Sequence, residues 1–166
     1  MLRNKIDYPY IPPDEIILYV GEDDKFMAEA KKYAKENSLD RNMPTASVIV
    51  KDGKIIGRGA NGSDYHEKHG CERAKRGIPT GEMYELCEGC HPKNHSEPRA
   101  IADALKNHTS DDLKKAGLYL WGHWWACEPC WKAIKNAGIK KVYLMKESHA
   151  KFNKSHPKNI IGRQFD

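Results

Sequence analysis

The spacing of apolar residues predicts one helix followed by a β-hairpin in the first third of the chain. Asp23 or Asp24 could cap the helix, since short acidic side chains accept hydrogen bonds from the first free amides. The apolar residues that follow share one helical face: Phe26, Met27, Ala30, Tyr33 and Ala34. Residues 45–50 and 55–59 are short apolar runs joined by a turn around Asp52-Gly53, which is typical of a hairpin.

The second half of the chain alternates between helical and strand-like spacing. Residues 96–105 repeat apolar positions at helical spacing and end at Asn107 and His108, and residues 127–137 form a second such run that ends at Gly138. Residues 118–121 and 141–145 are apolar enough for strands. Strands that alternate with helices predict a sheet covered by helices, with crossovers that make the last strands parallel. The expected fold class is α/β.

Three segments lack this periodicity. Residues 1–22 contain Pro9, Pro12 and Pro13 and are expected to form an irregular lead-in, because proline lacks the amide donor. Residues 146–166 are a polar tail. Residues 60–95 are rich in Gly, His and Cys, so we expect this stretch to be functional or held by something other than an apolar core. The whole chain, residues 1–166, is expected to be one domain.

Composition narrows the class of protein. The 166 residues are 39% hydrophobic and 31% charged, which is ordinary for a globular chain, and no run approaches the ~18 apolar residues of a membrane helix. The first residues lack the apolar run of a secretory signal, so a cytoplasmic location is expected. The net charge of +5 is spread along the chain rather than clustered as in a nucleic-acid footprint, although it would suit a phosphate on a small substrate.

One imidazole and one pair of thiols have the spacing of a catalytic zinc site. His95 and Glu97 stand where the helix of residues 96–105 begins, and Cys127 and Cys130 stand where the helix of residues 127–137 begins. His95, Cys127 and Cys130 would give zinc three protein ligands and leave its fourth position open, as in catalytic rather than structural sites. A helix N-terminus also lowers thiol pKa values. Glu97 could shuttle protons without binding the metal.

The same residues carry a family resemblance. Residues 95–101 (HSEPRAI) resemble the His-Ala-Glu-x-x-Ala-Ile motif of zinc-dependent cytidine and deoxycytidylate deaminases, and the CEPC motif of residues 127–130 looks like their second motif. The resemblance covers residues 45–145. It implies a three-layer α/β/α fold with a mixed sheet of about five strands, and a homo-oligomer in which neighbouring subunits help to enclose the active site. Residues 78–87 (IPTGEMYELC) look most like microbial deoxycytidylate deaminases, which favours dCMP as substrate.

Candidate substrate contacts follow from the resemblance. Asn61 matches the family's Asn that contacts the sugar. Ser96 replaces the usual Ala beside the catalytic Glu, and Ala126 replaces the usual Pro, so the pocket wall differs from the family pattern. Trp125 could stack on the base, although a Trp also simply fills cores.

A second zinc site is predicted within residues 60–95. Cys71, Cys87 and Cys90 with His91, or with His66 instead, could hold a structural Zn²⁺ that pins this stretch. Free thiols and exposed histidines are the alternative. The two Cys-x-x-Cys pairs also resemble a zinc ribbon, but a predicted helix separates them, and either pair alone could be a redox dithiol.

These observations predict an enzyme that hydrolyses the exocyclic amine of a cytosine nucleotide, dCMP to dUMP with release of ammonia. Two alternatives stay open: a deaminase that acts on a base in RNA or single-stranded DNA, and a non-catalytic zinc-binding module. No membrane association is expected.

Overall fold

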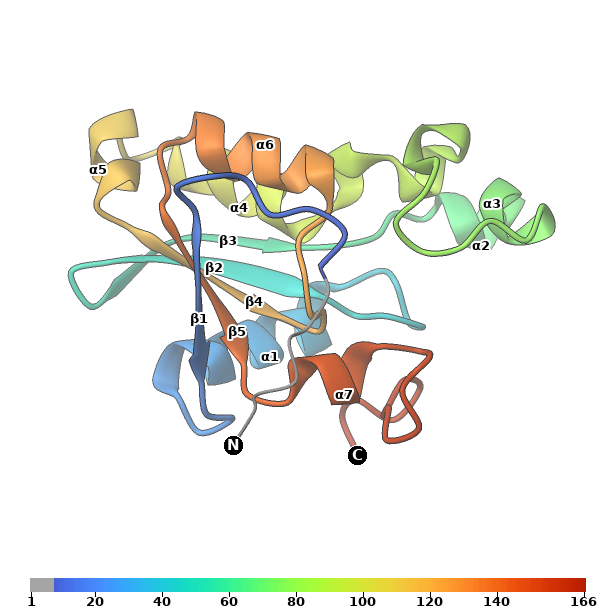
Figure 1. Ribbon diagram of the computed structural model, residues 1–166. Helices are drawn as coiled ribbons and strands as arrows, with labels where there is room; N and C mark the ends of the chain where they lie inside the picture. Colours follow the sequence, from blue (N-terminus) through green and yellow to red (C-terminus); the bar gives the residue numbers. More distant parts are fainter. Residues whose placement is uncertain (1–7) are drawn as a thin grey trace.

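A five-stranded mixed sheet forms the centre of the protein (Figure 1). The structure is a computed structural model that describes residues 8–166. The strands lie in the order β1-β5-β4-β2-β3; β1, β5 and β4 are parallel, while β2 is antiparallel to both β4 and β3. Their bounds are Ile16–Val20 (β1), Ala46–Lys51 (β2), Lys54–Ala60 (β3), Gly117–Trp121 (β4) and Lys141–Met145 (β5). The expected mixed α/β sheet is confirmed.

Helices cover both faces of this sheet, giving three layers (Figure 1). Helices α4 (Ser96–Ala104) and α6 (Glu128–Asn136) lie on one face, and α1 (Lys25–Asn37) and α7 (Ser148–Phe152) lie on the other. The alternation along β4 explains this: Leu118 and Leu120 pack in the cluster with α4 and α6, while Tyr119 and Trp121 pack with α1. Within the described residues, no helix is long and apolar enough to cross a membrane.

Glycines on β3 let α4 approach the sheet closely. A Cβ on Gly57 would lie 2.5 Å from the Ala100 carbonyl oxygen, and a Cβ on Gly59 would lie 2.4 Å from that of Ser96. Any side chain there would therefore push away the helix start that carries the predicted catalytic residues.

The predicted irregular lead-in over residues 1–22 was wrong for Ile16–Val20, which form β1. This strand pairs only with β5 within the described residues, and Ile16, Leu18 and Tyr19 are 48%, 37% and 42% exposed. Its apolar residues are therefore not confined to one face, so periodicity did not reveal it. Residues 1–7 lie outside the described part, and Pro9 lies at a bend.

The polar tail packs on the sheet more than its composition suggests. Phe152 of α7 is 1% exposed, Phe165 stacks on Trp121 at 5.4 Å between ring centroids, and the Gln164 side chain donates to the Asn42 carbonyl at 2.9 Å.

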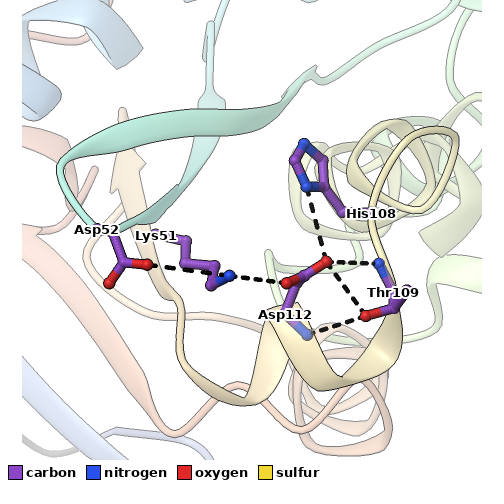
Figure 2. Close-up of polar contacts among 5 residues, drawn as sticks. All are labelled: Lys51, Asp52, His108, Thr109 and Asp112. Carbon is purple, nitrogen blue, oxygen red and sulfur yellow. Dashed lines mark hydrogen bonds and ion pairs between the residues drawn. The ribbon is translucent and has the colours of Figure 1, made fainter.

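A short helix, α5 (Ser110–Lys114), lies at the opposite end of the sheet from α2 (Tyr65–His69) and α3 (Glu72–Lys75) (Figure 1). A capping box begins it: the Thr109 hydroxyl accepts from the Asp112 amide, and the Asp112 carboxylate accepts from the Thr109 amide (Figure 2). Lys51 at the end of β2 donates to the same carboxylate at 2.7 Å. The helix start is thereby tied to the hairpin.

Candidate active site

Two helix starts bring the three predicted zinc ligands together. His95 is the cap of α4, and Cys127 is the cap of α6 with Cys130 in its first turn. The Nδ1 atom of His95 lies 3.2 Å from Cys130 Sγ and 3.4 Å from Cys127 Sγ, and the two sulfurs are 3.1 Å apart. The sequence prediction that these three residues converge is therefore met by the geometry.

The orientation of His95 suits a metal ligand. Its Nδ1 faces the thiols, while Nε2 lies 3.0 Å from the Cys90 carbonyl oxygen, to which it can donate. A ligating imidazole commonly donates its other N–H to such an acceptor, which fixes the tautomer and the ring orientation. The backbone carbonyl of Cys90, a residue outside the triad, thus helps to orient the His95 ring.

The donor set fits a zinc ion. Tetrahedral zinc bound at about 2.0–2.3 Å separates its ligand atoms by about 3.5–3.8 Å, so the triad needs to expand by less than about 1 Å. The hydrogen bond with Cys130 lowers the pKa of Cys127 to about 5, with His95 acting in the same direction against burial. One thiol of the pair is thus already poised to bind metal as a thiolate.

Glu97 lies in the first turn of α4 and is nearly sealed from solvent, with 5% of its surface exposed. The Ser96 hydroxyl donates to its Oε2 at 3.1 Å. Burial raises the pKa of Glu97 above the ordinary value, and the neighbouring Cys127 raises it further. A buried carboxyl with an elevated pKa beside a metal triad suits a group that takes up and returns protons.

A pocket of about 300 Å³ opens in front of this site, and Asn61, Ser96 and Trp125 all line it. This volume lies at the lower end of the range for small-molecule sites, about 300–1,000 Å³. Asn61 is already engaged: its Oδ1 accepts from Ser38 and Thr45, and its Nδ2 donates to the Met43 carbonyl. One N–H remains for a substrate, so its sugar contact stays a prediction.

Ser96 and Trp125 also have structural partners. The Ser96 hydroxyl is fully buried and lies 2.8 Å from that of Ser47 on β2, which makes it a support for Glu97. Trp125 is 5% exposed and belongs to the core cluster of α4 and α6 while it walls the pocket. For both residues the predicted substrate contact stays a prediction.

A second cluster of metal-binding side chains lies beside the first. Cys71, Cys87 and Cys90 gather around His66, with all four ligand atoms within 4.8 Å of one another. His66 Nε2 is 3.2 Å from Cys87 Sγ and 3.5 Å from Cys90 Sγ, and the sulfurs of Cys71 and Cys90 are 3.6 Å apart. These separations are close to the edges of a zinc tetrahedron.

Of the two histidines predicted as the fourth member, the structure places His66 and not His91 with the three cysteines. The Nδ1 atom of His91 instead accepts from the Lys93 amide in the turn that begins at Pro92. His66 reaches the cysteines because α2 packs against the turn at residues 88–90. Gly89 makes room for its ring, since a Cβ there would lie 2.5 Å from His66 Nε2.

Sequence reasoning also missed Arg73 and Tyr84. The buried Arg73 guanidinium donates to the carbonyls of Glu82 and Pro79 and lies 4.6 Å from the Tyr84 ring. Tyr84 in turn meets His95 edge-on, with ring centroids 4.8 Å apart. The aromatic residue at position 84 was visible within residues 78–87, but its contact with His95 depends on tertiary structure.

Comparison with known proteins gives consistent matches. A family model described as the cytidine and deoxycytidylate deaminase zinc-binding region matches residues 20–146. A deoxycytidylate deaminase from Pongo abelii is 27% identical over 139 residues, covering 79% of this chain and 68% of that protein.

Solved structures resemble the chain as well. The dCMP deaminase from the cyanophage S-TIM5 in apo form is 25% identical over 74% of this chain and 82% of its own, with a TM-score of 0.48. A guanine deaminase from Bacillus subtilis is 25% identical over 80% of this chain and 72% of its own, with a TM-score of 0.46.

Proposed function

Because this chain belongs to the cytidine and deoxycytidylate deaminase family, we propose that it hydrolyses the exocyclic amine of a cytosine nucleotide, converting dCMP to dUMP and ammonia. The observation that carries the chemistry is the buried Glu97 beside the convergent His95, Cys127 and Cys130. When bound, zinc supplies a Lewis acid that makes an attacking water acidic near neutral pH.

Glu97 performs the proton transfers in this proposal. Its carboxylate takes a proton from the attacking water and delivers it to the ring nitrogen next to the reacting carbon. It then takes a second proton from the hydroxyl group that the water has left on the reacting carbon and passes it to the departing amine, so that the carbonyl of the product forms and ammonia rather than amide ion leaves. The raised pKa of Glu97 favours this cycle because the carboxyl must hold and release a proton within one turnover. The Ser96 hydroxyl keeps Oε2 in place.

The choice of dCMP is supported by the relative from Pongo abelii, which is named a deoxycytidylate deaminase. The pocket offers side chains of the right kind: the Asn61 amide for the sugar, the Trp125 indole as a wall for the base, and the Lys154 ammonium for an anionic group. Each of these contacts belongs to the proposal.

A substrate panel tests it. Purified protein is assayed for ammonia release from dCMP, CMP, deoxycytidine, cytosine and a cytosine-bearing oligonucleotide. We expect the largest kcat/KM with dCMP. A preference for the oligonucleotide would replace the proposal with polymer editing, and no turnover with any compound while zinc is bound would favour a non-catalytic module.

We assign two zinc ions to each chain, a catalytic one at His95, Cys127 and Cys130 and a structural one at His66, Cys71, Cys87 and Cys90. The four-ligand set is typical of a structural site, whereas the three-ligand set leaves a position open. Metal analysis of the purified protein is expected to give two zinc ions per chain. A single zinc ion, retained when Cys87 is changed to Ser, would remove the structural site from the proposal.

A further inference from the structure

One residue of the second cluster, Cys90, also contacts the predicted catalytic triad. Cys90 contributes its Sγ to the cluster, and its backbone carbonyl oxygen lies 3.0 Å from His95 Nε2. The two sites are thus joined through one residue, whose side chain belongs to the cluster and whose backbone carbonyl faces His95.

We propose that metal bound by His66, Cys71, Cys87 and Cys90 positions His95, so that the second site sets the affinity and the activity of the catalytic one. This inference rests on the proposed function, because it takes His95 as a catalytic zinc ligand. Cys90 and Arg73 are positioning residues in it, and neither contacts the reacting atoms.

The local structure around Cys90 depends on side chains rather than on apolar packing. Residues 84–94 form three short 3-10 turns, Tyr84–Leu86, Glu88–Cys90 and Pro92–Asn94. Such turns have weak hydrogen-bond geometry of their own. A metal that binds Cys87 and Cys90 would fix both ends of the middle turn and, with it, the direction of the Cys90 carbonyl.

A second set of contacts also links the cluster to His95. Arg73 Nη1 donates to Cys90 Sγ at 3.3 Å, and the same guanidinium lies over the Tyr84 ring. Tyr84 packs edge-on against the His95 imidazole. The cluster therefore reaches His95 both through the carbonyl on its Nε2 side and through the aromatic ring beside it.

Loss of the second metal should free the Cys90 turn and remove the acceptor from His95. Partners that orient a metal-binding histidine are commonly worth about 10- to 100-fold in metal affinity or activity. We expect a change of that size at the catalytic site, although no catalytic ligand is altered.

The test compares matched histidine variants of the zinc-loaded protein. His66→Gln removes a cluster ligand, and His91→Gln makes the same change on a nearby histidine outside the cluster. Each protein is analysed for zinc content, and the release of its remaining zinc to a chromogenic chelator is followed with time. We expect His66→Gln to hold one zinc ion and to release it about 10- to 100-fold faster than wild type releases its catalytic zinc. His91→Gln should match wild type in both measurements.

Two further variants guard against misfolding. Cys87→Ser removes a ligand that does not line the pocket, and Gly89→Ala crowds the His66 ring without removing any ligand. Circular dichroism identifies the variants that are folded. Each folded variant should release the catalytic zinc faster than wild type does, and Gly89→Ala should show the smallest increase. Folded variants that lose the second zinc but keep the wild-type release rate would overturn the inference, as would a wild-type protein with one zinc ion. Wild-type protein that holds two zinc ions but deaminates nothing would instead refute the proposed function, and the release rates would still report on coupling.

Discussion

The sheet with its covering helices and the segment at residues 61–95 are held together by different forces. The sheet buries two apolar clusters, one under α4 and α6 and one under α1 and α7. The segment at residues 61–95 buries Arg73, Cys87 and Asn94, which are polar or metal-binding groups. The proposed zinc triad of His95, Cys127 and Cys130 lies where the two regions meet, since His95 begins α4 and contacts Cys90. We infer that the sheet is stable without metal, whereas the segment at residues 61–95 depends on a bound metal for its order.

The core of the sheet should show the largest effect on stability. Leu120→Ala removes a fully buried side chain from the centre of β4 and should lower the free energy of unfolding by about 2–5 kcal/mol, because the cavity is only partly filled by relaxation. Urea denaturation measures this change. A loss below about 1 kcal/mol would mean that the sheet is not the stable half of the molecule. Leu105→Ala, at a 46% exposed position, is the control.

Metal removal should affect hydrogen exchange differently in the two regions. When a chelator takes up the zinc, amides in residues 84–94 should exchange hydrogen rapidly, while those of β2 and β4 stay protected by the apolar clusters. Hydrogen exchange followed by mass spectrometry resolves these peptides. Equal loss of protection in the strands would contradict the division, and so would a segment that stays protected without metal.

The α5 cap tests a feature remote from the segment at residues 61–95. Thr109→Ala removes the cap hydroxyl (Figure 2) and should lower the free energy of unfolding by about 1 kcal/mol, a typical value for such caps. Zinc content and kcat should not change. Thermal melts with Ser110→Ala as the neighbouring control measure the effect, and altered zinc binding in Thr109→Ala would show that the far end of the sheet is coupled to the site.

The smallest effect concerns pH. The hydrogen bond from Lys51, together with those from Thr109, holds the pKa of Asp112 well below its ordinary value. This group's contribution to stability is therefore full above the ordinary carboxyl pKa of about 4 and is lost as pH falls through the lowered folded-state pKa. Asp112→Asn should destabilise the protein at pH 7 and matter less at strongly acidic pH, as urea midpoints at both pH values would show. Asp111→Asn is the matched control, and identical pH profiles for the two variants would contradict the assignment.

The sheet region and the convergence of His95, Cys127 and Cys130 could be predicted from the sequence for physical reasons. Period-2 and period-3.6 spacing report burial on a regular element, and His95, Cys127 and Cys130 each stand at a helix start that the same spacing reveals. The edge strand β1 was not predicted, because it pairs on one side only within the described residues and has three exposed apolar residues.

The segment at residues 61–95 could be predicted only in part. Ligand chemistry identified Cys71, Cys87 and Cys90, but sequence proximity favoured His91, whereas the fold brings in His66 from 21 positions before Cys87. The Cys90 carbonyl next to His95 was beyond sequence reasoning, because every residue has a carbonyl and only tertiary structure shows which one faces the imidazole.

The proposal that Glu97 transfers the protons of the reaction is tested most directly by the rate at which Glu97→Gln forms dUMP from dCMP. The zinc content of the same protein is measured in parallel. Glu36→Gln, an exposed glutamate on α1, is the matched control. Glu97→Gln is expected to keep its zinc and to lose about 10²- to 10⁴-fold in kcat, the usual contribution of a positioned acid–base group. Wild-type turnover by zinc-loaded Glu97→Gln would refute the proposed mechanism, because the protons would then move without the residue on which the proposed chemistry depends.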